Sequence, residues 1–327
     1  MFRSIFEDRG NWYKGNLHMH TTRSDGHLDP KEAVERYRRQ GYDFVALTDH
    51  RRPSVTIEPG ESKNPDGWKG QNAAAESAAL SADGMLILSG VEWDTGGANT
   101  KAPGDVPTYH ILGIGMTENL GIDYKKNPHP MPQEIVDAIR ADGGIAILAH
   151  PAWSVMDPAG IETVKGITAA EIYNTVSGLP FNGDRADSSA WFDIWATNYD
   201  RLIPALASDD AHSYEGDQCY SCTMVNAREL SRDSILDALQ TGNFYATQRP
   251  VIHEAAMDWE KGILHLEFSE DVMTAVFYSN HIWVPERVLQ VKGGKVDYHL
   301  APGEFYLRAE LIARDGRKAW ISPFRVD

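Results

Sequence analysis

Histidine and carboxylate side chains recur at short, regular spacings along the first two thirds of the chain. His18 and His20 are two residues apart, as are Asp210 and His212. Alternate residues of an extended segment point to the same side, so each pair can converge on one point. Imidazoles close to a carboxylate suit a divalent metal ion. The two pairs are therefore candidate metal ligands, although a single H-x-H pair is more often structural.

Other such residues stand next to apolar runs that predict strands. The segments LTDH, GVEW, YHILG, LAHP and SDDAH each place one at or near the end of a run, namely His50, Glu92, His110, His150 and Asp210. Histidines that merely fill a core would not recur at strand after strand. His110 precedes its run. Either that strand runs in the other direction, or His110 reaches the site from a loop.

Elements that position these residues can be expected from the apolar pattern. Strands are predicted at residues 16–20, 43–48, 85–93, 109–115, 145–149, 170–173 and 203–207, and helices at 30–40, 72–82, 132–142, 188–198 and 231–240. Apolar strands that alternate with helices indicate parallel β-structure covered on both faces. Seven of them favour a barrel over a flat sheet, and in barrels the chemistry lies at the C-terminal ends of the strands.

The pattern changes after Arg249-Pro250. Strands are predicted at residues 252–259, 263–268, 274–278, 305–313 and 319–324, with turn signals such as Gly293-Gly294 and Asp315-Gly316 and no helix between them. The sequence therefore predicts an α/β fold in two parts. Residues 1–249 would form the barrel, and residues 250–327 a small antiparallel β domain.

Six motifs in order, HMHTTRSDG, LTDH, GVEW, YHILG, LAHP and SDDAH, resemble those of the PHP (polymerase and histidinol phosphatase) superfamily over residues 16–250. The stretch LQTGNFYA at residues 239–246 is similar to a stand-alone branch grouped with carbaryl-hydrolase-like metallohydrolases. The resemblance implies a distorted seven-stranded (β/α) barrel with a metal cluster at the C-terminal ends of its strands.

The resemblance also implies the ligands of a trinuclear site with two to three divalent ions (Mn, Fe or Zn). One ion would be held by His18, His20, Glu92 and Asp210; a second by Glu92, His110 and His150; and a third by Asp25, His50 and His212. The family has Asp or His at the position of Asp25. Asp209 is expected to support Asp210 and to join Glu92 and Asp210 as a catalytic carboxylate. Asp49 is expected to face away from His50.

Hydrolysis of a phosphate ester by a metal-bridging hydroxide is the activity that this cluster predicts, because metal ions activate water and neutralise phosphoryl oxygens. The candidate proton donors are the ligand sphere, Asp209 and His27. Candidate substrate contacts are Arg51, Arg185, Asn174 of the segment EIYN, and His27, together with Arg23 and Arg52. Long loops at residues 51–70 and 94–107 are expected near the pocket. Trp68, Trp93 and Trp153 form an aromatic wall there or simply pack beneath the loops.

Composition limits the partners. The 327 residues include 31 Lys and Arg against 47 Asp and Glu, which gives a net charge of −16. This charge disfavours long nucleic acids and anionic membranes and leaves a small, phosphorylated substrate as the expected partner. No apolar run is long enough to span a membrane, so a cytoplasmic location is expected. Cys219 and Cys222 are expected to be reduced structural thiols.

Three other functions remain open, and so does the oligomeric state. A carboxylic or carbamic ester hydrolase using the same cluster is the main alternative, as the carbaryl-hydrolase resemblance implies. An exonuclease and an inactive barrel that serves as a binding module are the others.

Overall fold

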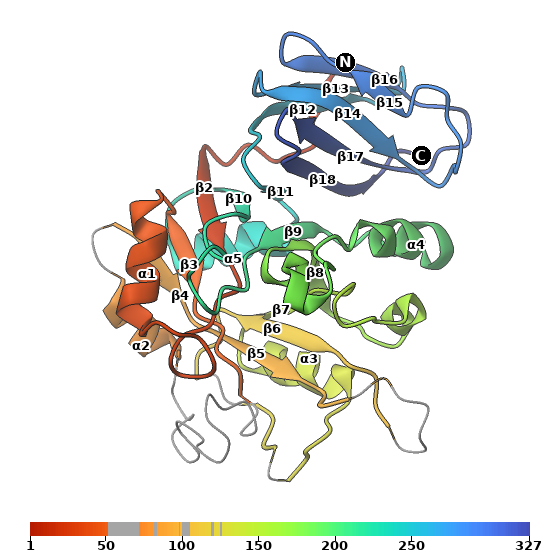
Figure 1. The fold of residues 1–327 in the computed structure, drawn as a ribbon. Helices are drawn as coiled ribbons and strands as arrows, with labels where there is room; N and C mark the ends of the chain where they lie inside the picture. The colour runs from red at the N-terminus through yellow and green to blue at the C-terminus, as the bar shows by residue number, and fades with distance from the viewer. Residues whose placement is uncertain (52–71, 82–83, 98, 100–104, 119–120, 125) are drawn as a thin grey trace.

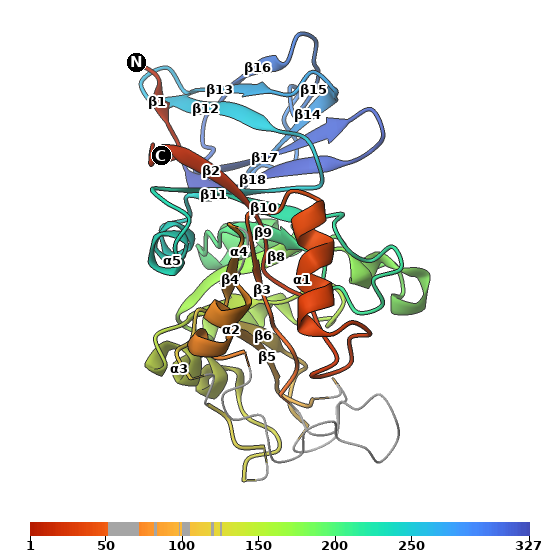
Figure 2. The same cartoon turned by 90° about the vertical axis from the view of Figure 1, so that its left-hand side faces the viewer.

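The computed structural model describes residues 1–51, 72–81, 84–97, 99, 105–118, 121–124 and 126–327. Within these residues the chain forms five α-helices and three β-sheets, a mixed α/β fold (Figure 1). The helices lie around the part of the molecule drawn at the bottom, and two layers of strands from the C-terminal third stand above it. Both chain termini lie in this upper part, as the second view confirms (Figure 2).

All five helices occur where the apolar periodicity predicts them. In the first, α1 (Pro30–Arg39), the Asp29 carboxylate accepts hydrogen bonds from the backbone N–H groups of Lys31 and Glu32 and so caps the helix. The others are α2 (Ala74–Leu80), α3 (Pro132–Ala141), α4 (Ser189–Tyr199) and α5 (Arg232–Gln240). Short 3₁₀ turns follow two of the strands: η1 (Pro158–Glu162), η2 (Val176–Gly178) and η3 (Pro180–Asn182).

A nine-stranded sheet has the order β15-β14-β17-β18-β11-β10-β2-β3-β4. Its part nearest the helices contains β2 (Asn11–Asn16), β3 (Phe44–Ala46), β4 (Leu86–Leu88), β10 (Cys222–Ala227) and β11 (Phe244–Thr247). The strand predicted at residues 16–20 is wrong in position, because β2 ends at Asn16 and the two histidines follow it. β10 and β11 were not predicted as strands, and they run antiparallel to each other.

A five-stranded sheet has the order β5-β6-β7-β8-β9. It contains β5 (Gly90–Asp94), β6 (His110–Ile114), β7 (Ile145–Leu148), β8 (Ile167–Asn174) and β9 (Ala205–Ser208). The strand predicted at residues 85–93 is two strands, β4 and β5, in different sheets. At Gly90 the chain passes so close to its neighbour that an added Cβ would lie 2.6 Å from the Leu47 carbonyl oxygen. Only glycine fits at this crossing.

The predicted alternation of strands and helices is confirmed in part, because among the described residues β4, β5 and β6 follow one another without a helix between them. Purely parallel pairing is wrong. β6 runs antiparallel to both β5 and β7, whereas β7, β8 and β9 are parallel. Backbone pairing divides the strands between two sheets, so a closed seven-stranded barrel is not confirmed. The two sheets meet at isolated parallel bridges, Met19 with Ala211 and His50 with Glu92.

The C-terminal residues are antiparallel β-structure, as predicted. A four-stranded sheet contains β1 (Arg3–Ser4), β12 (Ile252–Asp258), β13 (Ile263–Phe268) and β16 (Lys295–His299); the nine-stranded sheet takes β14 (Val272–Tyr278), β15 (Val288–Gln290), β17 (Tyr306–Ala313) and β18 (Lys318–Arg325). β1, β15 and β16 were missed because they are short and largely exposed. β18 pairs with β11, so the sheet is continuous past residue 250, and the domain boundary there stays a prediction.

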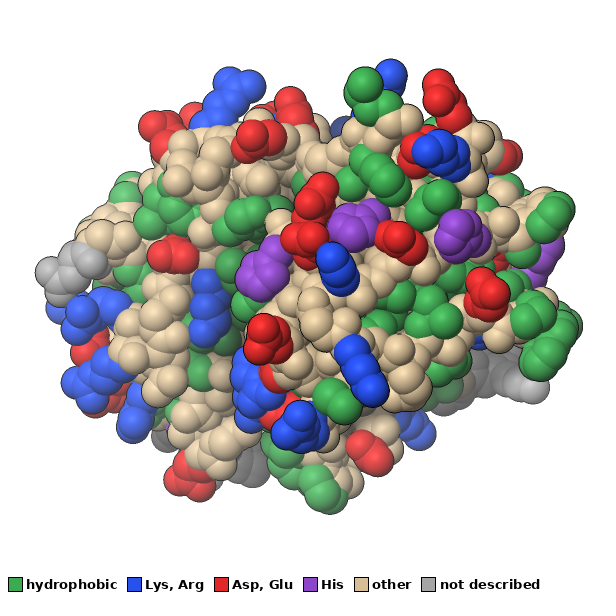
Figure 3. All heavy atoms as spheres, turned by 90° about the horizontal axis from the view of Figure 1, so that it is seen from above, with side chains coloured by type: hydrophobic (Ala, Val, Ile, Leu, Met, Phe, Trp, Pro, Cys, Tyr) green, Lys and Arg blue, Asp and Glu red, His purple; other side chains and the backbone are tan. Residues whose placement is uncertain are grey.

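The surface above the C-terminal strands carries charges of both signs. Figure 3 shows acidic, basic and apolar side chains interspersed on this face. Among the described residues, no helix combines the length and apolar character needed to cross a bilayer. Cys219 and Cys222 are free thiols, and burial raises the pKa of each to about 12.

Candidate metal centre

Two short segments lie side by side where the two sheets meet. The backbone N–H of Asp210 donates to the carbonyl of His18, and that of His20 donates to the carbonyl of Ala211. This pairing aligns residues 18–20 with residues 210–212, so that both i, i+2 pairs face the same space. The Nε2 atoms of His18 and His20 lie 3.2 Å apart. The Asp210 Oδ1 atom lies 3.0 Å from the first and 2.9 Å from the second.

Glu92 is the central carboxylate of the cluster. Its Oε2 atom lies 3.0 Å from the Nε2 atoms of both His18 and His20 and 3.4 Å from His50 Nδ1. Its Oε1 atom lies 2.6 Å from His110 Nδ1 and 3.4 Å from His150 Nε2. The side chain is 1 % exposed. Glu92 therefore connects five of the predicted histidines in the core of the molecule.

The direction of β6 explains His110. In the antiparallel register His110 pairs with Asp94, the last residue of β5. The first residue of β6 therefore lies at the same end of the sheet as the last residues of its neighbours. Of the two explanations that the sequence leaves open, the reversed strand is the one that the structure shows.

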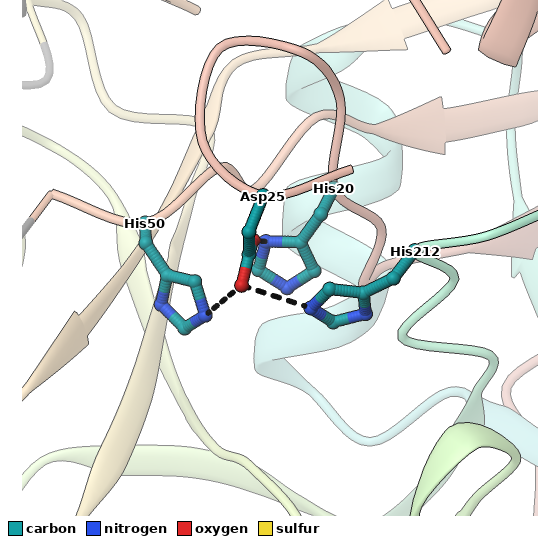
Figure 4. Close-up of side chains that lie close together, drawn as sticks. All are labelled: His20, Asp25, His50 and His212. Carbon is teal, nitrogen blue, oxygen red and sulfur yellow. Dashed lines mark ion pairs between the residues drawn. The ribbon is translucent and has the colours of Figure 1, made fainter. Parts of the chain in front are cut away.

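Asp25 joins the remaining ligand candidates at the rim (Figure 4). Its Oδ2 atom lies 3.8 Å from His50 Nε2 and 3.5 Å from His212 Nε2, and its Oδ1 atom lies 3.6 Å from His20 Nδ1. The Asp25 side chain is 28 % exposed. In Figure 4 the three imidazoles surround the carboxylate. All nine predicted ligands therefore converge, although they come from segments between residues 18 and 212.

The donor set fits divalent metal ions. The buried atoms Asp25 Oδ1 and His50 Nδ1 have no hydrogen-bond partner, and buried polar atoms are normally paired. Donor atoms fall into three overlapping groups within 4.8 Å: His18, His20, Glu92 and Asp210; His20, Asp25, His50 and His212; and His50, Glu92 and His110. The first group matches the implied set. In the others His20 joins Asp25, and His50 rather than His150 lies with Glu92 and His110.

Electrostatics favour charged side chains in the cluster. Burial opposes the protonated imidazoles, but the carboxylates of Asp210 and Glu92 raise the pKa of His18 well above its usual value and that of His20 to about 10. Burial likewise opposes ionised Glu92, but the surrounding histidines hold the pKa of its carboxyl well below its usual range. Bound cations would take the place of these imidazole protons.

Two ligand candidates are held in an unusual backbone conformation. The φ angle is +27° at His150 and +56° at Asp210. Side chains other than glycine rarely adopt positive φ, which costs about 1–3 kcal/mol and persists where surrounding structure enforces it. The backbone at both residues is therefore consistent with a functional constraint.

Glu171 is a residue that the sequence analysis missed. Its fully buried carboxylate lies 2.9 Å from His18 Nδ1 and accepts hydrogen bonds from the His150 backbone N–H at 2.8 Å and Asn174 Nδ2 at 2.8 Å. A carboxylate on Nδ1 leaves Nε2 of His18 free to bind a metal. The available signal was the segment EIYN, in which Glu171 stands three residues before Asn174.

Asn174 and Asp209 support the cluster from behind. Asn174 Nδ2 also donates to Asp210 Oδ2 at 3.2 Å. Asp209 accepts hydrogen bonds from Tyr37, Thr175 and the backbone N–H groups of residues 219–221. Burial raises the pKa of Asp209 to about 6 although these hydrogen bonds oppose the rise. Neither residue lines the cavity described below. Asp49 faces away from His50, as expected, and accepts from Thr21, Ser24 and Asn72.

Three of the predicted arginines, Arg23, Arg51 and Arg185, lie among the described residues. Arg51 is 7 % exposed and packs over the Trp93 ring, and burial lowers its pKa to about 10. Arg23 pairs with Asn72 and Glu76. Arg185 is exposed. Arg52, Trp68, most of the loop at 51–70 and part of the loop at 94–107 lie outside the described residues.

A cavity of about 400 Å³ opens over the cluster. Seven of the predicted ligands line it along with other residues, among them His27, Trp153, Val176, Ser177, Phe181 and Asn182. Among the residues proposed for substrate binding that the structure describes, His27 reaches the cavity, and Arg51, Arg185 and Asn174 are not part of its lining. The arrangement can bind metal ions on the floor of a pocket sized for a small molecule.

Comparisons with known proteins agree with this architecture. No family model matches the chain. A two-domain protein from Bacteroides vulgatus that contains a predicted PHP-like metal-dependent phosphoesterase superposes with a TM-score of 0.51 and 18 % identity over 98 % of both chains. The chain has a PHP-like fold. The resemblance seen in the motifs is thus confirmed at the level of the fold.

Two curated proteins are similar in sequence. A 5'-3' exoribonuclease from Haemophilus influenzae is 27 % identical over 42 % of this chain and 69 % of that protein. The DNA polymerase/3'-5' exonuclease PolX from Bacillus subtilis is 33 % identical over 25 % of this chain. The match spans 14 % of the PolX length. Both names describe nucleases, proteins that cleave phosphodiester bonds.

Proposed function

We propose that the chain is a metal-dependent hydrolase that cleaves a phosphate ester, either a monoester or a diester, of a small organic molecule. The observation that carries the proposal is the convergence of six histidines and three carboxylates below a cavity of about 400 Å³. Similarity to nucleases supports phosphoester chemistry. In this proposal the two sheets form opposite walls of a distorted (β/α) barrel.

Two to three divalent ions, Mn, Fe or Zn, would be held by the nine converging residues. When bound, such ions lower the pKa of water and neutralise charge on phosphoryl oxygens. The protein's own part is orientation. Glu171 fixes the ring of His18, Asn174 fixes Asp210, and Glu92 links five of the histidines.

His27 is the proposed proton donor to the leaving group. It lines the cavity, and its backbone N–H donates to the carbonyl of His212, which places it beside the rim of the cluster. Asp209 fits this role less well, because its carboxylate is 0 % exposed and already accepts five hydrogen bonds from Tyr37, Thr175 and residues 219–221. We therefore assign Asp209 to holding the segment after Asp210.

Metal analysis and a substrate panel test the proposal. Protein purified without chelator is expected to contain about two or three equivalents of transition metal, and phosphate esters are expected to be hydrolysed faster than the matched acetate or carbamate. The panel contains nitrophenyl phosphate, bis-nitrophenyl phosphate, nitrophenyl acetate and a nitrophenyl carbamate. Asp210→Asn serves as the inactive control. Faster turnover of the carboxylic or carbamic esters would favour the alternative hydrolase and overturn the phosphoesterase.

Exonuclease activity is the second candidate, favoured by the similarity to the exoribonuclease. The net charge of −16 and the small cavity favour a small substrate instead. Processive degradation of a long single strand at physiological salt would decide for the nuclease.

A further inference from the structure

We propose that Trp153 and Phe181 form a subsite for an uncharged, planar aromatic group of the substrate. This inference rests on the proposed function and names the part of the substrate that the metal cluster does not bind. Both residues line the cavity over the cluster. The subsite is therefore continuous with the place where the ester would be cleaved.

Trp153 lies directly against the ligand candidates. Its ring centre is 4.9 Å from that of His150 and 5.4 Å from that of His110, at interplanar angles of 78° and 72°. Its Nε1 donates to Asn182 Oδ1 at 3.3 Å. These contacts fix the indole from both sides. A planar group that extends from the cluster would meet an aromatic surface already in position.

Phe181 presents its ring to solvent at the same cavity. It is 78 % exposed, although the turn that carries it is held by internal hydrogen bonds. Asn182 Nδ2 donates to the carbonyl of Val176 at 2.9 Å, and the backbone N–H of Asn182 donates to the carbonyl of Leu179 at 2.8 Å. A large apolar side chain on a fixed turn at a pocket is available for a ligand to cover.

The charge of the cavity wall points to an uncharged group. Apart from the histidines, the cavity-lining residues that the structure describes include no Lys or Arg. Asp217, also in the lining, keeps its carboxylate engaged with the backbone N–H groups of residues 212–214. Apart from the histidines, a second anionic group of the substrate would find no cationic side chain among these residues, whereas an aromatic ring would find the two aromatic side chains Trp153 and Phe181.

Three phosphate monoesters separate aromatic recognition from size and leaving-group chemistry: benzyl, cyclohexylmethyl and methyl phosphate. All three leaving groups are primary alcohols, and the first two differ mainly in planarity and aromaticity. For Phe181→Ala we expect kcat/KM for benzyl phosphate to fall about fivefold to tenfold, as for the loss of an aromatic pair. The other two esters should change less than twofold by the same reasoning. Phe181→Tyr should restore the preference for the benzyl ester.

Trp283→Ala is the matched control, because Trp283 is 77 % exposed and lies outside the cavity lining. It should leave all three kcat/KM values unchanged. Equal losses for the benzyl and cyclohexylmethyl esters in Phe181→Ala would overturn the aromatic subsite while leaving the phosphoesterase intact.

A binding measurement keeps the two proposals separable. Benzylphosphonate should bind the metal-loaded wild-type protein more tightly than methylphosphonate in calorimetry, and Phe181→Ala should remove the difference. If no phosphate ester is hydrolysed, the proposed function fails, and this titration alone decides the subsite. Equal affinity for the two phosphonates in the wild type would overturn it.

Discussion

The candidate metal centre has an inner and an outer part that differ in burial. The inner group, His18, His20, Glu92 and Asp210, has side chains between 0 % and 7 % exposed. The outer group shares His20 with it and adds Asp25, His50 and His212, which are 28 %, 10 % and 26 % exposed. Buried ligands exchange with solvent through local opening of the fold, and exposed ones do not need it. The inner ions are therefore expected to be retained and the outer ion to exchange.

The inner and outer groups also differ in the residues that support them. Glu171 and Asn174 brace the inner group through hydrogen bonds to His18 and Asp210. Asp25 lies in the loop after His20, and its Oδ1 atom has no hydrogen-bond partner. Rigid, braced donors bind a metal with less loss of side-chain freedom than a loop carboxylate does.

Glu92→Gln should have the largest effect, because this carboxylate joins both groups. We expect the metal content to collapse and kcat/KM to fall more than about 1,000-fold, beyond the loss of a single electrostatic contact. Elemental analysis of dialysed protein and turnover of the best phosphate ester measure the two effects. Retention of all metal equivalents would show that Glu92 is not the common ligand.

Asp25→Asn should break the centre at its outer part alone. We expect loss of one metal equivalent and retention of the others, whereas Asp210→Asn should release inner metal as well. Activity should fall by about 100-fold or more in Asp25→Asn. Changing a residue that only supports a ligand costs up to about 100-fold, and removing a ligand should cost at least as much. Loss of every equivalent from Asp25→Asn would contradict the division into two parts.

Glu171→Gln should weaken the inner group without removing a ligand. A neutral amide stabilises the metal-binding orientation of His18 less than the Glu171 carboxylate does, so we expect the metal affinity to fall about 10-fold to 100-fold. Competition with a chelator measures the affinity, and saturating metal should recover most of the activity. An unchanged affinity together with a lower melting temperature would indicate that Glu171 is only structural.

Metal binding should strengthen as the pH rises. In the metal-free protein burial opposes protonation of His20, but Asp210 and Glu92 raise its pKa from 6.5 to about 10. Protonated His20 thus stabilises the metal-free fold fully below pH 6.5, and this contribution disappears as the pH rises through 10. A metal ion must displace the same proton.

Melting in chelator and calorimetric metal titration test this linkage. The melting temperature of the metal-free protein should fall toward high pH, while metal affinity increases and protons are released. Binding enthalpies that do not depend on the ionisation enthalpy of the buffer would show that no proton is released.

The convergence of the ligand candidates could be predicted from the sequence, whereas their surroundings could not. His18, His20, Asp210 and His212 carry their signal in i, i+2 spacing and in motif order, which do not depend on how the sheets pair. The direction of β6 depends on which edge of the sheet its strand joins, so the placement of His110 remained open. Glu171 and the burial of Arg51 depend on long-range packing, which one sequence does not display.

The smallest effect is expected at a second group of similar residues. Glu254, His265 and Glu267, on β12 and β13, also bring donor atoms within 4.8 Å. His265 Nδ1 lies 2.6 Å from Asp297 Oδ1, and the side chains are 23 % and 54 % exposed. This ion pair already satisfies the imidazole, and water screens the nearby carboxylates.

His265→Ala should therefore leave metal content and kcat/KM unchanged and alter stability by less than about 0.5 kcal/mol. Loss of a tightly held metal equivalent would show that donor atoms close to one another bind a metal ion tightly even when they are exposed. That result would contradict the argument that burial makes the inner group bind its metal tightly.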